Sequence, residues 1–356
     1  MSPNALTFAL IALLSFPGAF TAPTQNGTSS QNIILRDLAR PRYFGAAMNT
    51  TFLFHDQAYT KLIQTQFSAF TPENEMKWEE IEPEPNQFVF GPADEIVKEA
   101  QTLYAKVRGH NFEWNNQLAP WVNTSLTAVE LDRALQNHIT TILNHYRGKL
   151  YAVDVVNELI SDNTPNETFK QGIWDTKFGE DAIPKALTYA RAADPHNTVK
   201  LYINEYGTEG IDSKSDALYN VVKGFLADGV PLDGIGFQCH FGLGQVPPTL
   251  QQNLRRFTDL GLDVAVTELD INIGTGNPQN ATAFALQAQD YWTVVNACVN
   301  VERCVGVSVW GVSDDHSWLP NGAVLPWDKN KQPKPAFYAI ADAFQGKPKP
   351  GLPTDN

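Results

Sequence analysis

Two glutamates close short apolar segments that contain no basic residue. Glu158 ends the segment Asp-Val-Val-Asn-Glu, and Glu268 ends Val-Ala-Val-Thr-Glu. A carboxyl group in apolar surroundings has an altered proton affinity more often than one on a polar surface. Either residue alone could be a helix cap or half of an ion pair. Two such carboxyls that face each other can serve as an acid and as a nucleophile or base, the pair that hydrolysis of a glycosidic bond requires.

The two glutamates belong to a repeating pattern of short apolar runs, each followed by a longer amphipathic stretch. The runs are Phe44–Asn49, Ala69–Glu75, Ala105–Trp114, Tyr151–Glu158, Val199–Tyr206, Gly234–Phe241, Asp263–Ile271 and Val305–Asp314. Between them, Leu126–Tyr146, Ala182–Ala193 and Ala281–Val299 carry apolar residues at helical spacing. Nearly continuous apolar strands that alternate with helices predict a parallel sheet covered on both faces. Eight such units predict an α/β fold of the closed (β/α)8 barrel (TIM barrel) type, in a single domain.

An open, doubly wound sheet is the alternative fold, but no Gly-x-Gly-x-x-Gly turn follows the first strand. In a barrel, the C-terminal ends of the strands carry the active site. Those ends hold groups that can bind a polyhydroxylated ligand, namely Glu73, Asn74, His110, Trp114, Asn157, Glu158, Asn204, Glu205, Gln238, His240, Glu268, Asp270 and Trp310. The fourth and seventh strands would place Glu158 and Glu268 on opposite sides of the barrel mouth.

The composition excludes several classes of protein. The chain has 356 residues, of which 43% are hydrophobic and 18% charged, so it can fold around a large core. Its net charge of −13 would repel a nucleic-acid backbone and an anionic membrane surface. We expect no nucleic-acid partner, no cofactor and no metal, because the histidines are scattered and no His-x-x-His or His-Glu-x-x-His pattern occurs.

The two ends of the chain differ from its centre. Residues 1–22 resemble a signal peptide with an apolar run from Ala5 to Phe20, although no Lys or Arg precedes that run. An uncleaved anchor is the alternative, and cleavage after Ala19 or after Ala22 fits equally well. Residues 23–32 form a polar linker and 346–356 a flexible tail, which leaves 33–345 as the folded domain. We therefore expect a secreted, extracellular protein that does not contact a membrane once the signal is removed.

Secretion has two chemical consequences. Five Asn-x-Ser/Thr sequons are candidate glycosylation sites, at Asn26, Asn49, Asn123, Asn166 and Asn280. In an oxidising compartment Cys298 and Cys304 can close a short loop by a disulfide, which leaves Cys239 as a buried thiol.

Several longer motifs resemble those of glycoside hydrolase family 10, the endo-β-1,4-xylanases, and they occur in the family order. The motifs are Thr71-Pro-Glu-Asn-Glu-Met-Lys-Trp78, Arg108-Gly-His110 with Trp114 and Gln117, Asp154-Val-Val-Asn-Glu158, Gly234-Ile-Gly with Gln238 and His240, Thr267-Glu-Leu-Asp270, and Val309-Trp-Gly-Val-Ser-Asp314. The resemblance covers residues 33 to 345. It implies a secreted enzyme that cleaves internal bonds of xylan with retention of configuration, through a covalent glycosyl-enzyme intermediate.

The resemblance also implies residue roles. Glu158 matches the acid/base, Glu268 matches the nucleophile, and His240 and Asp270 match the groups that orient it. The expected substrate contacts are Glu73, Asn74, Lys77, His110, Trp114, Gln117, Asn157 and Gln238, with Trp310 and Trp318 as aromatic floor and lid. The chain departs from the family pattern at Glu113, Asn115, Val153, Glu205, Gly207, Cys239 and Leu319, where the family has, in turn, an apolar residue, His, Trp, Asp, Asn, Thr and Arg.

Three functions compete at this point. The first is a monomeric xylanase whose partners are xylan and xylo-oligosaccharides. A β-1,4-glucanase would share the glutamate pair and differ in the residues around the sugar. An inactive xylan-binding protein is the third, and two intact glutamates argue against it. The length of the products, the tolerance of side branches and the pH optimum do not follow from the sequence.

Overall fold

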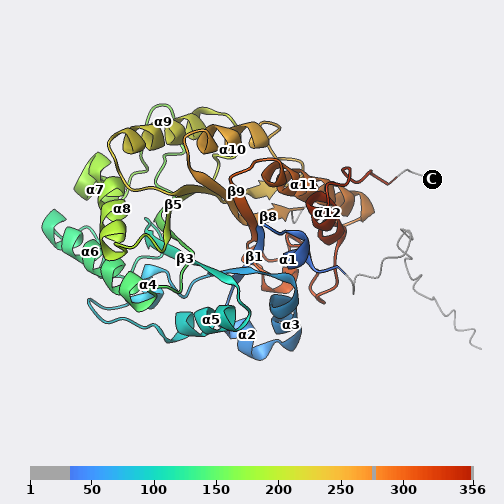
Figure 1. The fold of residues 1–356 in the computed structure, drawn as a ribbon, viewed down its shortest axis with the longest axis horizontal. Helices are drawn as coiled ribbons and strands as arrows, with labels where there is room; N and C mark the ends of the chain where they lie inside the picture. Colours follow the sequence, from blue (N-terminus) through green and yellow to red (C-terminus); the bar gives the residue numbers. More distant parts are fainter. Residues whose placement is uncertain (1–32, 275–277, 354–356) are drawn as a thin grey trace, which may run out of the picture. The chain divides into compact units, whose positions relative to one another are not determined.

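The apolar runs form strands that pair side by side around a closed ring. A computed structural model describes residues 33–274 and 278–353. The strand order is β6-β5-β4-β3-β2-β1-β9-β8-β7, and an additional pairing of β6 with β8 closes the ring (Figure 1). All of these pairings are parallel. The prediction of a (β/α)8 barrel is confirmed.

The described strands lie where the apolar runs predict them, with ends that differ by a few residues. They are β1 (Tyr43–Met48), β2 (Ala69–Pro72), β3 (Lys106–Glu113), β4 (Ala152–Asn157), β5 (Lys200–Glu205), β6 (Gly234–Phe237), β7 (His240–Gly242), β8 (Asp263–Asn272) and β9 (Cys304–Val309). The sixth run was predicted as one strand to Phe241, and this is wrong. Cys239 has a φ of 63°, so the chain turns there and continues as β7, which pairs with β8.

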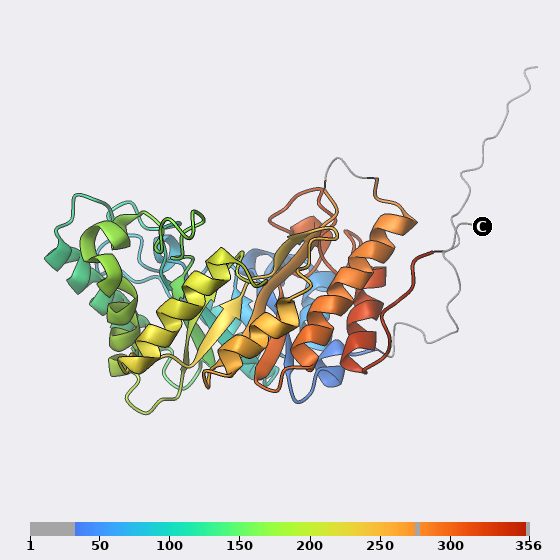
Figure 2. The same cartoon turned by 90° about the horizontal axis from the view of Figure 1, so that it is seen from above.

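Helices surround the ring, and those of the second half stand side by side along its outside (Figure 2). The longer ones are α3 (Gln57–Gln66), α5 (Gly91–Thr102), α6 (Ala128–His145), α8 (Ala182–Ala193), α9 (Ser213–Ala227), α10 (Leu250–Thr258), α11 (Ala281–Val299) and α12 (Pro335–Phe344). The shorter ones are α1 (Leu35–Leu38), α2 (Thr50–His55), α4 (Trp78–Ile81), α7 (Ile173–Phe178), η2 (Gly179–Asp181) and η3 (Asp314–His316). The bounds of α8 and α11 agree with the prediction. The helix predicted from Leu126 begins later, because Thr127 and Glu130 form a capping box before α6.

Aromatic rings and a buried ion pair pack together among the strands. Glycine is required opposite two of the rings. A Cβ at position 234 would lie 2.4 Å from the Tyr202 ring, and one at position 306 would lie 2.4 Å from the Tyr43 ring. Arg108 donates to Asp154 through Nε at 3.0 Å and through a second, shorter contact from Nη2, and both side chains are buried.

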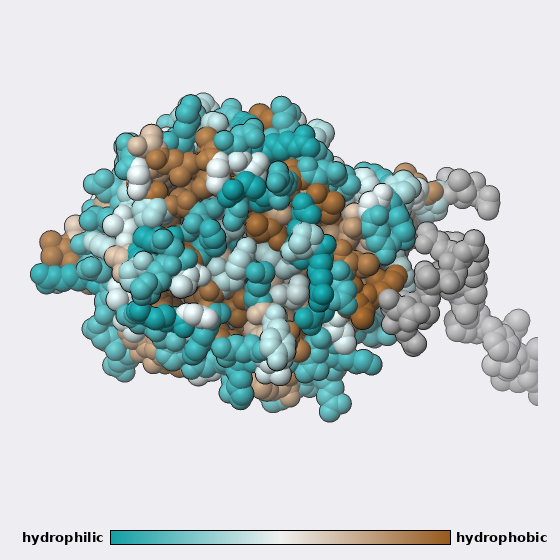
Figure 3. Space-filling view, in the orientation of Figure 1, coloured by the Kyte–Doolittle hydropathy of each residue, from teal (hydrophilic) through white to brown (hydrophobic). Residues whose placement is uncertain are grey.

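The structure describes the two ends of the chain to different extents. The signal peptide, the linker and Asn26 lie outside the described residues. The described part of the tail accepts hydrogen bonds from α11, where Trp292 and Gln289 donate to the carbonyls of Lys347 and Pro350. Among the described residues, no helix has both the length and the apolar composition needed to cross a bilayer. Polar residues dominate the face shown in Figure 3, with apolar residues scattered between them.

The covalent prediction is confirmed, and the described sequons differ in exposure. Cys298 and Cys304 form a disulfide with their Cα atoms 5.2 Å apart, and Cys239 is a buried free thiol. Asn123, Asn166 and Asn280 are exposed. Asn49 is half-buried, and its side-chain amide nitrogen, the atom that a glycan would occupy, donates to Glu73 at 3.1 Å.

The Asp154→Asn variant tests how much the barrel depends on its internal ion pair. It leaves the Arg108 charge buried without a counter-charge, so we expect the free energy of unfolding to fall by about 3–5 kcal/mol in denaturant titrations. The matched control is Asp342→Asn, which removes a surface pair with Lys347 at 3.0 Å and should cost at most about 1 kcal/mol. Equal losses in the two variants would contradict this account.

Candidate active site

Glu268 lies in the middle of β8, and both of its carboxylate oxygens have a partner. Its side chain is only 6% exposed. Asn204, near the end of β5, donates from Nδ2 to Oε1 at 2.7 Å. His240, the first residue of β7, lies with Nε2 3.2 Å from Oε2. The turn at Cys239 therefore places an imidazole beside the carboxylate.

The charges around Glu268 favour its ionised form. Asp270 Oδ1 lies 3.0 Å from Nδ1 of His240, so this imidazole stands between two carboxylates. Burial alone would lower the pKa of His240, but Asp270 and Glu268 raise it to about 10. Burial alone would raise the pKa of Glu268, but the hydrogen bond from His240 and the charges of His110 and His240 lower it below its ordinary value. The pair is an imidazolium and a carboxylate at neutral pH.

Glu158 has a different environment. It follows β4 directly, is half-buried and has a φ of 57°. Trp114 donates from Nε1 to Oε2 at 2.9 Å, and Gln238 donates from Nε2 to Oε1 at 3.0 Å. Trp114 is itself held by Trp174, whose Nε1 donates to its carbonyl at 2.7 Å. Glu158 is thus a fixed carboxyl group that solvent or a ligand can reach.

Asn204 links Glu268 to Asn157, the residue next to Glu158, and it was expected only as one of the polar groups at the strand ends. Its Nδ2 donates to Asn157 Oδ1 at 2.9 Å as well as to Glu268, and its Oδ1 accepts from Thr267 at 2.7 Å. The signal was present, because Asn204 ends an apolar run as Asn157 does. Nδ2 of Asn157 is buried and has no partner among the described residues, which leaves a donor for a ligand.

A second group of predicted residues surrounds Lys77. Its ammonium donates to Asn74 at 2.9 Å and to Gln117 at 2.7 Å, and it lies 5.3 Å from the Trp114 ring centroid. Burial lowers the pKa of Lys77, and the carboxylates of Glu268, Glu73 and Glu158 partly oppose that effect. Since Trp114 also contacts Glu158, this polar group adjoins the glutamate pair.

Three tryptophans of the predicted motifs have different settings. Trp310 is 7% exposed, and its ring packs edge-on against His110 and His240 with centroids 5.2 and 6.5 Å away. Trp318 is 52% exposed and lies 5.3 Å from the His240 ring. Trp78 belongs to the core, stacked on His138 with centroids 3.8 Å apart. The structure therefore brings Trp310 and Trp318 to the site and keeps Trp78 away from it.

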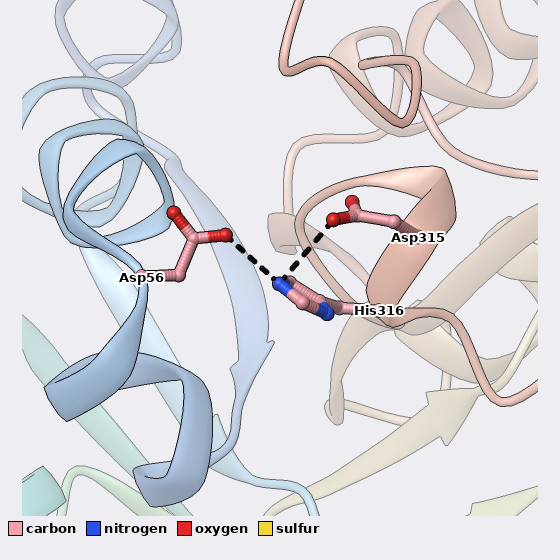
Figure 4. A group of neighbouring side chains, drawn as sticks. All are labelled: Asp56, Asp315 and His316. Carbon is pink, nitrogen blue, oxygen red and sulfur yellow. Dashed lines mark hydrogen bonds and ion pairs between the residues drawn. The ribbon is translucent and has the colours of Figure 1, made fainter.

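The loop that carries Trp318 is tied to the other end of the chain. His316 in η3 lies 3.0 Å from Asp56, at the junction of α2 and α3, and 3.4 Å from Asp315 (Figure 4). These three residues could offer ligands to a metal ion. However, Lys331 already contacts both carboxylates, with its ammonium 2.6 Å from Asp56. We interpret this group as an ion-pair cluster that fixes the loop.

Two departures from the family pattern place buried carboxyl groups near the site. Burial raises the pKa of Glu113 to about 8, and neither of its oxygens has a hydrogen-bond partner among the described residues. Burial also raises the pKa of Glu205 to about 7, against the effect of Lys214 at 3.3 Å and of the Ile160 amide that donates to it. The Glu113 side chain is neutral at pH 7, so it adds little charge beside the catalytic candidates.

The remaining predicted substrate contacts, His110 and Glu73, belong to the same assembly of side chains. His110 is held through Nδ1 by Asp154 at 2.9 Å, and Glu73 accepts from Asn49. The assembled site contains an ionised, buried carboxylate, a reachable carboxyl group, amide donors and three indole rings, those of Trp114, Trp310 and Trp318. Such a set can supply a nucleophile and a proton donor to a neutral, hydroxyl-rich substrate.

Known sequences resemble this chain over most of its length. The sequence profile of glycosyl hydrolase family 10 matches residues 35–343. Endo-1,4-beta-xylanase A of Phanerodontia chrysosporium is 43% identical over 329 residues, which cover 89% of this chain and 79% of that protein. An endo-1,4-beta-xylanase of Agaricus bisporus is 39% identical over 318 residues, 86% of this chain and 92% of that protein.

Solved structures resemble the fold equally well. A glycosylated endo-beta-1,4-xylanase from Gloeophyllum trabeum is 45% identical, with a TM-score of 0.82 and coverage of 87% of this chain and 98% of that one. Xylanase 10B from Thermotoga petrophila, solved in complex with xylobiose, is 33% identical, with a TM-score of 0.83 and coverage of 90% and 99%.

The raised pKa of His240 predicts a pH dependence of stability. The folded state holds this proton up to a pH of about 10, whereas the unfolded chain releases it near 6.5. The stabilisation is complete below pH 6.5 and is lost as the pH rises toward 10. Across this window, wild type should lose unfolding free energy on the order of 1 kcal/mol per pH unit relative to His240→Gln. Denaturant titrations at several pH values measure the unfolding free energy of both proteins. If it changes with pH equally in wild type and in His240→Gln, the prediction is refuted.

Proposed function

Because the chain belongs to glycosyl hydrolase family 10, we propose that it hydrolyses internal β-1,4-xylosidic bonds of xylan with retention of configuration. The observation that carries this proposal is the pair formed by an ionised, buried Glu268 and a reachable Glu158, joined through Asn204 and Asn157. The relatives named endo-1,4-beta-xylanase support the choice of xylan.

In the first step, Glu268 attacks the anomeric carbon and forms an ester bond to the sugar. The bond to the leaving oxygen breaks, and Glu158 gives that oxygen its proton. In the second step, Glu158 takes a proton from water, which attacks the anomeric carbon and releases Glu268. The imidazolium of His240 keeps Glu268 ionised before the attack, and it transfers no proton in either step.

The polar groups around the pair suit a neutral sugar chain. Sugars present hydroxyls at their edges and C–H groups on their faces, so amide and ammonium donors combined with indole rings can hold them. Lys77, Asn74 and Gln117 would bind hydroxyls on one side of the cleaved bond. The unpartnered Nδ2 of Asn157 is a donor for the hydroxyl next to the anomeric carbon. Trp310 and Trp318 would contact sugar faces.

We further propose that the protein is secreted and acts outside the cell as a monomer. The apolar segment at its N-terminus and the Cys298–Cys304 disulfide support this location. Asn123, Asn166 and Asn280 are the described sequons whose side chains are free of the site, and they would carry any glycans on the domain.

Substrate choice is tested by measuring reducing sugar released from xylan and from carboxymethylcellulose. The proposal predicts release from xylan at a rate at least tenfold higher. Preference for the cellulose derivative would favour a β-1,4-glucanase, and inactivity on both would favour a binding protein.

The stereochemistry of the product is the second expected outcome. A double displacement inverts the anomeric carbon twice, so the new ends must appear first in the β configuration. Proton NMR during the first minutes of xylo-oligosaccharide hydrolysis detects them before mutarotation. Initial release of α ends would exclude the covalent intermediate.

The two glutamates should respond differently to the same substitution. Glu158→Gln should reduce xylan cleavage by about a hundredfold or more, because the leaving oxygen loses its proton donor. It should spare the first step on an aryl xylobioside, because a phenolate leaves without a proton. Added azide should restore turnover and yield a β-glycosyl azide.

Glu268→Gln is the matched variant, and it should abolish activity on both substrates because no covalent intermediate can form. Equal losses of the two variants on the aryl substrate would contradict the separate roles, and azide rescue of Glu268→Gln through a β product with rescue of Glu158→Gln through an α product would reverse the assignment.

A further inference from the structure

The indole of Trp318 has an exposed ring and an N–H group that points to a buried carboxylate. The residue is 52% exposed and is the only tryptophan among the described residues with a largely exposed side chain. Its Nε1 donates to Oδ2 of Asp270 at 2.8 Å, and Asp270 is 1% exposed. A ring contact for sugar does not require this hydrogen bond.

The hydrogen bond extends the chain of charged groups that ends at Glu268. Asp270 uses Oδ2 for Trp318 and Oδ1 for Nδ1 of His240, at 3.0 Å. The other ring nitrogen of His240 lies 3.2 Å from Glu268. One donor therefore fixes the orientation of Asp270, which in turn orients the imidazolium toward Glu268. Trp318 is the only side chain among the described residues that donates to Oδ2 of Asp270.

The position of Trp318 is set independently of this hydrogen bond. Two residues earlier, His316 is held by Asp56 and stacks on Phe52 with ring centroids 3.8 Å apart. The next residue, Leu319, donates its amide to Ser317 Oγ at 3.1 Å. The loop therefore presents the indole N–H to Asp270, although the next residue, Leu319, stands where the family pattern has an arginine.

We propose that Trp318 is a positioning residue for Glu268, acting through Asp270 and His240, in addition to any contact of its ring with substrate. This inference rests on the proposed function, since it assigns Glu268 as the nucleophile. Without the N–H donor, Asp270 loses a partner for Oδ2 and can turn away from Nδ1 of His240. The imidazolium then holds Glu268 less well, and Glu268 takes up a proton at a higher pH.

Other charged groups also face Glu268. His110 on β3 and Asp154 on β4 act on it through their charges, and Lys77 faces both Glu268 and Glu158. None of them contacts Trp318 in a hydrogen bond or an ion pair among the described residues. A change in the ionisation of Glu268 in a Trp318 variant therefore reports on the path through Asp270.

The test is the Trp318→Phe variant, which keeps an aromatic ring and removes the N–H donor. The measurement is kcat/KM for an aryl xylobioside as a function of pH, because its acidic limb reports the ionisation of the nucleophile in the free enzyme. We expect the midpoint of this acidic limb to shift to a higher pH, by about half a pH unit or more. KM should change less than about threefold, since a ring remains.

Two further variants separate the N–H group from the ring and from folding. Trp318→Leu should show the same shift of the acidic limb as Trp318→Phe. Because it also lacks the ring, it should have a higher KM for long xylo-oligosaccharides. Trp292→Phe makes the same chemical change where the indole donates to the Lys347 carbonyl, and it should leave the profile unchanged. In an Asp270→Asn background, Trp318→Phe should cause no further shift, because both act on one path.

The results distinguish a wrong role for Trp318 from a wrong proposed function. Suppose that wild type cleaves xylan, and that Trp318→Phe raises KM but leaves the acidic limb of the kcat/KM profile at the same pH. Trp318 is then only a ring contact, and the inference is wrong. A shift that persists in the Asp270→Asn background also overturns it. If wild type cleaves neither xylan nor the aryl xylobioside, the proposed function itself fails.

Discussion

A carboxylate as deeply buried as Glu268 would become protonated unless the protein around it supplied compensating charge and hydrogen bonds. His240 supplies both, because Asp270 together with Glu268 itself keeps the imidazole protonated. Asn204 satisfies the other oxygen. These partners come from β5, from β7 and from β8 itself, so the ionisation of one side chain depends on three strands being in register.

The closed barrel provides that register. Parallel strands end at the same side of the ring, which brings Glu158 and Glu268 together although they lie 110 residues apart in the sequence. Their surroundings then separate their chemistry. Glu268 is buried beside an imidazolium, whereas Glu158 is half-buried and accepts only from neutral donors, Trp114 and Gln238. Glu268 is thus held as an anion, while Glu158 stays within reach of a substrate, and the proposed two-step hydrolysis relies on this difference.

The barrel and the residues at its mouth could be predicted because their signals are local. Buried parallel strands are almost continuously apolar, and polar residues such as Asn157 and Glu268 interrupt that pattern at their ends. The turn at Cys239 could not be predicted, since the apolar run continues across it and only the backbone conformation breaks the strand. The contact between His316 and Asp56 joins residues 260 positions apart, and no local pattern indicates it. Trp78 and Trp318 look alike in sequence, and only packing assigns the first to the core.

A trapped covalent intermediate would show which side chain is the nucleophile. A 2-fluoro xylobioside with a dinitrophenol leaving group slows the second step more than the first, so the sugar ester accumulates on the enzyme. Mass spectrometry of the intact protein and of its peptides then locates the added sugar. The account predicts one fluoroxylobiosyl group, on the peptide that contains Glu268, and none on Glu268→Gln. A label on Glu158, or full turnover with no label, would contradict it.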